Sequence, residues 1–140
     1  MGAIIDELDD HEGYALRRLA DGTLTGAWTD GVRDFTAYVA GCACGWHSRH
    51  QHPPTEEGEE AAYQQWEREH AVVELARQAT RHRQDLARVL EWLGGQAGRL
   101  HDPATLGRVA RGLDRAHRLV SDVQRDRERQ ASEREAAGER

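Results

Sequence analysis

The chain has 140 residues, a formal net charge of -6, 38% hydrophobic residues and a single Phe. This composition disfavours one thick core and favours long amphipathic helices, which bury only a stripe of side chains. The negative charge argues against indiscriminate polyanion binding. No apolar run approaches the ~20 residues of a membrane helix and no secretory pattern opens the chain, so we expect a cytoplasmic protein.

Residues 1–21 suggest a short helix. Apolar residues recur between acidic ones at Ile4, Ile5, Leu8, Ala15, Leu16 and Leu19. Asp9 or Asp10 is a suitable N-cap and Gly22 a suitable stop. We therefore predict a helix that ends near Ala20.

Residues 23–39 predict a β-hairpin. Asp30-Gly31 is a favoured pair for a type I′ turn, because both positions need positive φ. With the turn there, Leu24 pairs with Ala37 on a face of alternating apolar residues. A two-stranded hairpin is marginal alone in water, so this one needs a helix, a metal or a partner to cover it.

The second half of the chain predicts two long helices. Thr55 is a good N-cap for a helix that starts near residue 56 and ends at Gly94-Gly95. Asp102-Pro103 then begins the second helix, with Asp as the N-cap and Pro in the first turn. A short glycine-rich connection joins them, so we predict an antiparallel αα-hairpin.

Each predicted helix carries an apolar stripe with spacings of three and four residues. The first stripe contains Val72, Leu75, Ala76, Ala79, His82, Leu86, Val89, Leu90 and Leu93, and the second contains Leu106, Val109, Ala110, Leu113, His117, Val120 and Gln124. These stripes exceed what the hairpin can cover. We therefore expect a homodimer that buries them in a four-helix, coiled-coil-like interface.

The predicted fold class is α+β. A short N-terminal helix precedes a two-stranded antiparallel hairpin with a metal knuckle, and a long αα-hairpin follows. We divide the chain into a hairpin and knuckle region at 1–70, a helical hairpin at 71–124, and a frayed or disordered polar tail at 125–140.

The knuckle contains both cysteines of the chain, Cys42 and Cys44, flanked by Gly41 and Gly45. Thiolates are preferred ligands for Zn²⁺, and the glycines permit a tight turn. The gap of one residue is shorter than the usual ligand spacing. Two small residues at a strand end are the main alternative, followed by a strained redox pair.

With two thiols available, the remaining ligands must be His or carboxylate. The histidine candidates are His47, His50, His52 and His70. Three histidines within six residues also fit an ordinary solvated loop. We choose His52 as the fourth ligand, with His50 or His47 as substitutes.

The Cys42-x-Cys44-Gly45-Trp46 run with the downstream Trp66-x-x-x-His70 resembles small uncharacterised zinc-knuckle proteins of high-GC bacteria. The resemblance covers roughly residues 24–72. It implies a metal site formed with Cys42, Cys44 and His70, and it implies no activity.

A stripe of arginines runs along the second predicted helix at Arg108, Arg111, Arg115 and Arg118. Such a stripe is typical of a helix that faces phosphate. Acidic residues interrupt it, however, so a solvated face is the preferred interpretation.

No catalytic motif is present in the sequence, and we expect no enzyme activity. The function we favour is a zinc-stabilised interaction module that dimerises through its helices and binds an unknown protein partner. The alternative is a nucleic-acid-binding accessory or transcriptional regulator that uses the arginine stripe.

Overall fold

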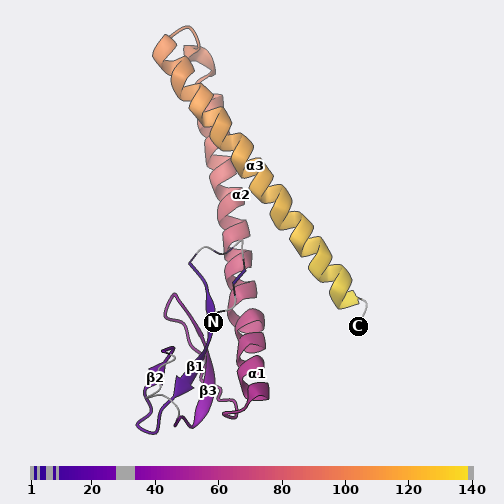
Figure 1. The fold of residues 1–140 in the computed structure, drawn as a ribbon. Helices are drawn as coiled ribbons and strands as arrows, with labels where there is room; N and C mark the ends of the chain where they lie inside the picture. Colours follow the sequence, from indigo (N-terminus) through magenta and orange to yellow (C-terminus); the bar gives the residue numbers. More distant parts are fainter. Residues whose placement is uncertain (1, 3, 6–7, 9, 28–33, 139–140) are drawn as a thin grey trace. The chain divides into compact units, whose positions relative to one another are not determined.

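The protein is described by a computed structural model that covers residues 2, 4–5, 8, 10–27 and 34–138. The fold class is α+β, with an antiparallel sheet and long helices (Figure 1). The chain forms two compact units, residues 1–76 and 77–140. The first contains the sheet, and the second is a pair of helices.

The sheet has three antiparallel strands in the order β2-β1-β3. Strand β1 (Gly13–Arg18) is central, β2 (Leu24–Thr25) is short, and β3 (Ala37–Cys42) is buried along its full length. The register pairs Gly13 with Cys42 and Arg18 with Ala37. The beginning of β1 therefore lies beside the end of β3, where the cysteines are.

The predicted N-terminal helix is wrong, because its second half is strand β1. Local propensity permits a helix here, but pairing with the apolar β3 overrides it. Gly22, expected as a helix stop, lies instead in the turn between β1 and β2 with φ of 87°. The backbone N–H of Leu19 closes this turn by donating to Thr23.

The predicted two-stranded hairpin is replaced by the three-stranded sheet. Leu24 and Ala37 do not pair with each other, because each pairs with Arg18 from opposite edges of β1. The sequence between β2 and β3 thus joins the two outer strands. The predicted Asp30-Gly31 turn lies outside the described residues.

The free edge of β3 is covered by the loop that follows it. Isolated bridges join Tyr38 to His52 and Gly41 to His47. The Ser48 N–H also donates to the Ala40 carbonyl at 2.8 Å. Pairing along both edges explains why β3, unlike an ordinary edge strand, is fully buried.

The long helical segment starts where expected. Helix α1 (Glu56–Trp66) is capped by Thr55, whose hydroxyl accepts from the Gly58 N–H at 3.2 Å. A π-helical turn, η2 (Glu67–Ala71), then leads directly into α2 (Val72–Gly95). Such turns interrupt the regular spacing of side chains and are frequent at functional sites.

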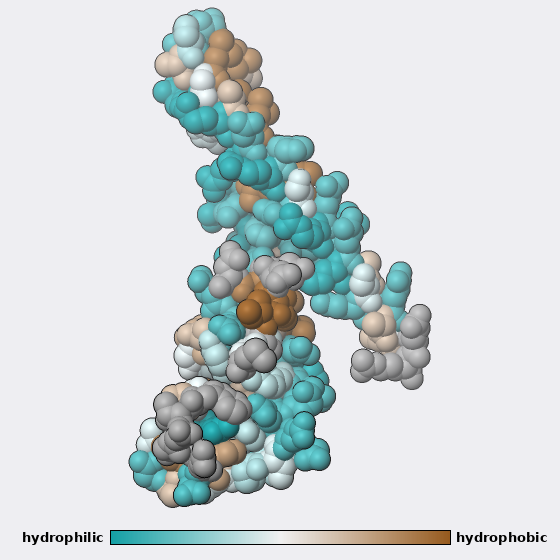
Figure 2. All heavy atoms as spheres, viewed as in Figure 1, coloured by the Kyte–Doolittle hydropathy of each residue, from teal (hydrophilic) through white to brown (hydrophobic). Residues whose placement is uncertain are grey.

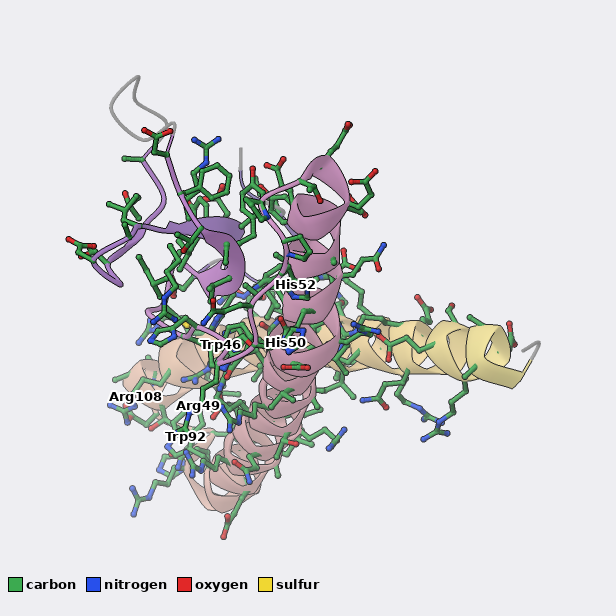
Figure 3. The ribbon with its side chains drawn as sticks, turned by 90° about the horizontal axis from the view of Figure 1, so that it is seen from below. Trp46, Arg49, His50, His52, Trp92 and Arg108 are labelled. Atoms are coloured by element: carbon green, nitrogen blue, oxygen red, sulfur yellow. The ribbon has the colours of Figure 1, made fainter. Side chains whose placement is uncertain are left out.

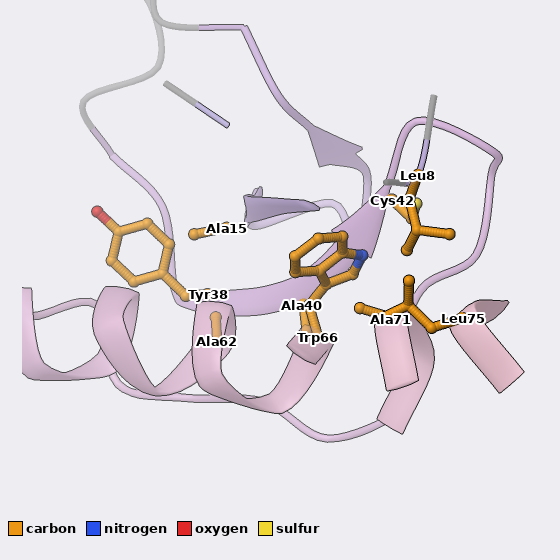
Figure 4. Packing of buried hydrophobic residues seen from close by; sticks show 9 residues of the cluster. All are labelled: Leu8, Ala15, Tyr38, Ala40, Cys42, Ala62, Trp66, Ala71 and Leu75. Carbon is orange, nitrogen blue, oxygen red and sulfur yellow. The ribbon is translucent and has the colours of Figure 1, made fainter. Parts of the chain in front are cut away.

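Helix α1 and the start of α2 cover one face of the sheet (Figure 4). Trp66 is fully buried at the centre of this core. Its ring lies against the backbone of Gly13, where an added Cβ would come within 2.3 Å of the ring. A glycine at the start of β1 is therefore required for the helix to pack so close to the sheet. The cluster around the ring contains Leu8, Ala15, Tyr38, Ala40, Cys42, Ala62, Ala71 and Leu75.

The second unit pairs part of α2 with α3 (Pro103–Gly138) after a short 3₁₀ turn, η3 (Ala97–Arg99). As predicted, Asp102 caps α3 and accepts from the Thr105 N–H at 3.3 Å. The Thr105 hydroxyl also donates to this carboxylate and helps to hold the pKa of Asp102 below its usual value.

The tail predicted to fray is part of helix α3, which continues to Gly138. Its Ala, Glu, Gln and Arg residues are strong helix formers. Ion pairs one turn apart support it, since Arg129 contacts Asp126 at 3.4 Å and Glu133 at 3.8 Å. Asp126 also accepts from His82 of α2 at 2.8 Å, which fastens the two helices together.

The stripe that α3 buries is not the predicted one. Val89 packs with Ala116 and Leu119, and Leu86 and Leu93 flank this cluster. The predicted stripe residues Leu106, Leu113 and Val120 are instead 49%, 57% and 40% exposed. Apolar side chains are visible on the surface near the α2–α3 turn (Figure 2). Among the described residues, every helix is too short or too polar to cross a membrane.

Candidate metal centre

The turn after β3 directs two sulfur atoms toward the helix. The Gly45 N–H donates to the Cys42 carbonyl at 3.0 Å, and the Cys42 N–H donates to Trp46 at 2.8 Å. Gly45 has a φ of 96°, a conformation that glycine adopts without strain. The sequence prediction of a tight glycine-flanked turn at Cys42 and Cys44 agrees with this geometry.

His11 is brought to the same place by the register of the sheet. Gly13 pairs with Cys42, so the two residues that precede β1 lie beside the turn that follows β3. The Ala43 N–H donates to the Glu12 carbonyl at 2.8 Å and fixes this approach. His11 is therefore held next to the cysteines, although it lies 31 positions before Cys42 in the sequence.

His70 reaches the cluster from the π-helical turn η2. It is buried, and the Trp46 ring stacks on its imidazole with centroids 4.6 Å apart and an angle of 11°. The stacked indole fixes the ring plane of His70. The imidazole Nε2 then faces Cys44 Sγ at 3.3 Å.

These four side chains have the geometry of a metal site. The candidate ligand atoms of His11, Cys42, Cys44 and His70 all lie within 4.8 Å of one another. His11 Nδ1 is 3.2 Å from His70 Nε2 and 3.6 Å from Cys42 Sγ. Tetrahedral Zn²⁺ with ordinary bond lengths separates two nitrogens by about 3.3 Å and a nitrogen from a sulfur by about 3.5 Å. The four residues therefore lie close enough together to bind a metal ion.

The surroundings fit this arrangement. Glu74 is buried, and its carboxylate lies 3.7 Å from His11 Nε2, the ring nitrogen that points away from the cluster. Carboxylates in this position orient metal-bound histidines. Desolvation raises the pKa of the Cys44 thiol above its usual value, and the neighbouring Cys42 adds to the effect. A bound cation would oppose this by favouring the thiolate.

The histidine loop does not contribute to the cluster. His52 Nε2 contacts Gln65 Oε1 at 2.8 Å, beside helix α1 (Figure 3). The His50 ring packs edge-on against the His52 ring, with centroids 4.7 Å apart, and His47 is exposed. The structure thus brings together Cys42, Cys44 and His70 of the predicted ligands, but it places His52 and both of its substitutes elsewhere.

His11 is the candidate ligand that sequence reasoning missed. The signal that could have revealed it is strand β1 itself, because a strand paired with β3 in this register carries its preceding residues to the cysteines. A helix prediction for the same residues concealed that proximity.

The arginine stripe is divided between two environments. Arg108, Arg111 and Arg115 line a cavity on the helix pair. Arg118 is exposed and is not among the residues that line it.

Comparison of the chain with protein-family models, curated proteins and solved structures returned no match.

Proposed function

We propose that the protein is a non-enzymatic interaction module stabilised by Zn²⁺. The observation that carries this proposal is the convergence of two sulfurs and two imidazole nitrogens within 4.8 Å. A Cys₂His₂ donor set suits Zn²⁺, since thiolates and imidazoles are its preferred ligands. Mg²⁺ and Ca²⁺ prefer oxygen ligands.

A structural role is favoured because the site offers four candidate ligands. A catalytic zinc keeps one position open for water or substrate, whereas four protein ligands close the coordination sphere. The metal would join three segments: the entry to β1 through His11, the exit from β3 through Cys42 and Cys44, and η2 through His70. Its binding free energy would then contribute directly to folding of this unit.

The interaction part of the proposal rests on α3. Leu106, Ala110, Leu113, His117 and Val120 alternate spacings of four and three, as in the seam of a coiled coil. Three of them are large apolar residues that are at least 40% exposed. A second copy of the chain is the partner we propose for this seam.

Elemental analysis of untagged protein tests the metal site. We expect about one zinc per chain, and we expect Cys44→Ser to retain much less. Ala43→Ser is the matched control, because it introduces the same hydroxyl group at the neighbouring exposed position. Cobalt substitution adds a spectroscopic test, since tetrahedral thiolate coordination gives intense visible bands. Metal-free wild-type protein that also fails to take up zinc or cobalt would refute the proposal.

A further inference from the structure

The α2–α3 pair contains a cavity of about 560 Å³ that the metal site does not use. This volume is in the range of small-ligand sites. Four arginines line the cavity, Arg88 from α2 and Arg108, Arg111 and Arg115 from α3. Asp85 is the only acidic residue among its lining residues, which gives the lining a net charge of +3. This concentration of positive charge contrasts with the chain's net charge of -6.

The arginines are available to a ligand. The Arg108 guanidinium donates to the Thr105 hydroxyl at 3.1 Å, which uses one of its five N–H groups. Asp85 lies 3.8 Å from Arg88, at a loose ion-pair distance. Within the part of the chain that the structure describes, Arg111 and Arg115 make neither an ion pair nor a hydrogen bond. Two guanidinium groups therefore keep their full hydrogen-bonding capacity.

Trp92 supplies an aromatic surface in the same cavity. It is 40% exposed, and it lies near Arg108 in Figure 3. Its ring rests on the backbone of Gly112, where an added Cβ would come within 2.8 Å of the indole. The glycine therefore lets α3 approach the indole and support it, while part of the indole stays open to a ligand.

We propose that this cavity binds a phosphorylated nucleoside, with the base stacked on Trp92 and the phosphate held by Arg111 and Arg115. Guanidinium groups bind phosphate through paired hydrogen bonds. An exposed indole accepts any base by stacking, which is how proteins bind single strands without sequence preference. A duplex hides the faces of its bases, so the ligand is a free nucleotide or a nucleotide within a single strand.

Binding assays with defined probes test this site. Fluorescence anisotropy would follow a labelled single-stranded 12-mer, with the duplex of the same sequence, adenosine monophosphate and inorganic phosphate as competitors. We expect the single strand to bind more tightly than the duplex, and the nucleotide to compete better than phosphate. If saturating adenosine monophosphate displaces the labelled strand, a free nucleotide is sufficient for binding. Binding of the strand alone identifies a chain of nucleotides as the ligand.

Matched variants distinguish binding in the cavity from general electrostatic attraction to the helix. Arg111→Glu should weaken binding roughly tenfold or more, whereas Arg118→Glu, with the same charge change on the same helix, should weaken it much less. Trp92→Leu should also weaken binding roughly tenfold, and Trp92→Phe should retain most of it. Helical circular dichroism would confirm that each variant is folded. Equal effects of Arg111→Glu and Arg118→Glu, undiminished binding by Trp92→Leu, or no binding of any probe at low salt would each overturn the proposal.

Discussion

At the scale of single residues, His11 determines whether the candidate metal centre has three or four protein ligands. Without it, two sulfurs and one imidazole would leave a position open to water, as in a catalytic site. With it, four candidate ligands are present, and the Glu74 carboxylate lies 3.7 Å from Nε2, while Nδ1 faces the cluster. The choice between a structural and a catalytic role for the proposed zinc therefore depends on one side chain.

We predict that His11→Ala weakens zinc binding by more than the roughly 10–100-fold that loss of an outer hydrogen-bond partner costs. His47→Ala is the matched control, because His47 is exposed and lies outside the cluster. Competition with a chromophoric chelator measures both affinities. Equal affinities for the two variants would show that His11 is not a ligand.

At the scale of elements, sequence reasoning located the helices better than the sheet. The caps and breaks of the helices are local signals, because each acts on its own turn. They are Thr55, Gly94-Gly95 and Asp102-Pro103. Strand β1 depends on β3, which lies about twenty residues further along the chain, so no local pattern specifies it. The prediction of the metal site shows the same contrast. The cysteine turn is recognisable in the sequence, whereas the fourth candidate ligand, His11, depends on the register of the sheet.

The prediction of which face of α3 is buried failed for a related reason. Two apolar stripes follow this helix, one through Leu106 and Leu113 and the other through Ala116 and Leu119. Side-chain volume favours the first stripe as the core. The close approach of Gly112 to Trp92 instead selects the second, since a small residue lets the helices approach at that point.

We predict that metal removal loosens the sheet unit and leaves the helix pair intact. The proposed ion joins β1, β3 and η2, whereas α2 and α3 have their own cluster and the His82–Asp126 contact. Amide hydrogen exchange after chelation should therefore accelerate in β1 and β3 and change little in α3. The chelator should have no such effect on Cys44→Ser, which serves as the control. Equal acceleration in both units would contradict this division.

At the scale of the whole molecule, the two sides of α3 carry different proposed tasks. At about 100° per residue, Leu106, Leu113 and Val120 project from nearly the same direction. Arg111 and Arg115 project from the opposite side of the helix, toward the cavity. A partner helix on the leucine seam would therefore leave the arginine side accessible, so dimerisation and nucleotide binding are compatible.

The apolar seam of α3, through Leu106, Leu113 and Val120, is exposed within one chain. We expect a homodimer, because Leu113 is 57% exposed and belongs to a regular heptad-like series. Leu113→Asp should weaken dimerisation by about 100-fold or more, since the interface would bury an unpaired charge. The exposure of Leu113 within one chain makes it a better probe than Leu86, which packs beside the Val89 cluster and whose replacement would disturb the helix pair itself.

Leu113→Met is the matched control, because it preserves volume and apolar character and should keep the dimer. Light scattering coupled to size-exclusion chromatography measures the mass of each variant at tens of micromolar protein. Circular dichroism should report equal helix content for both, since the substituted side chain lies outside the intramolecular cluster. A wild-type protein with the mass of one chain at that concentration would refute the dimer and leave the seam to a different partner.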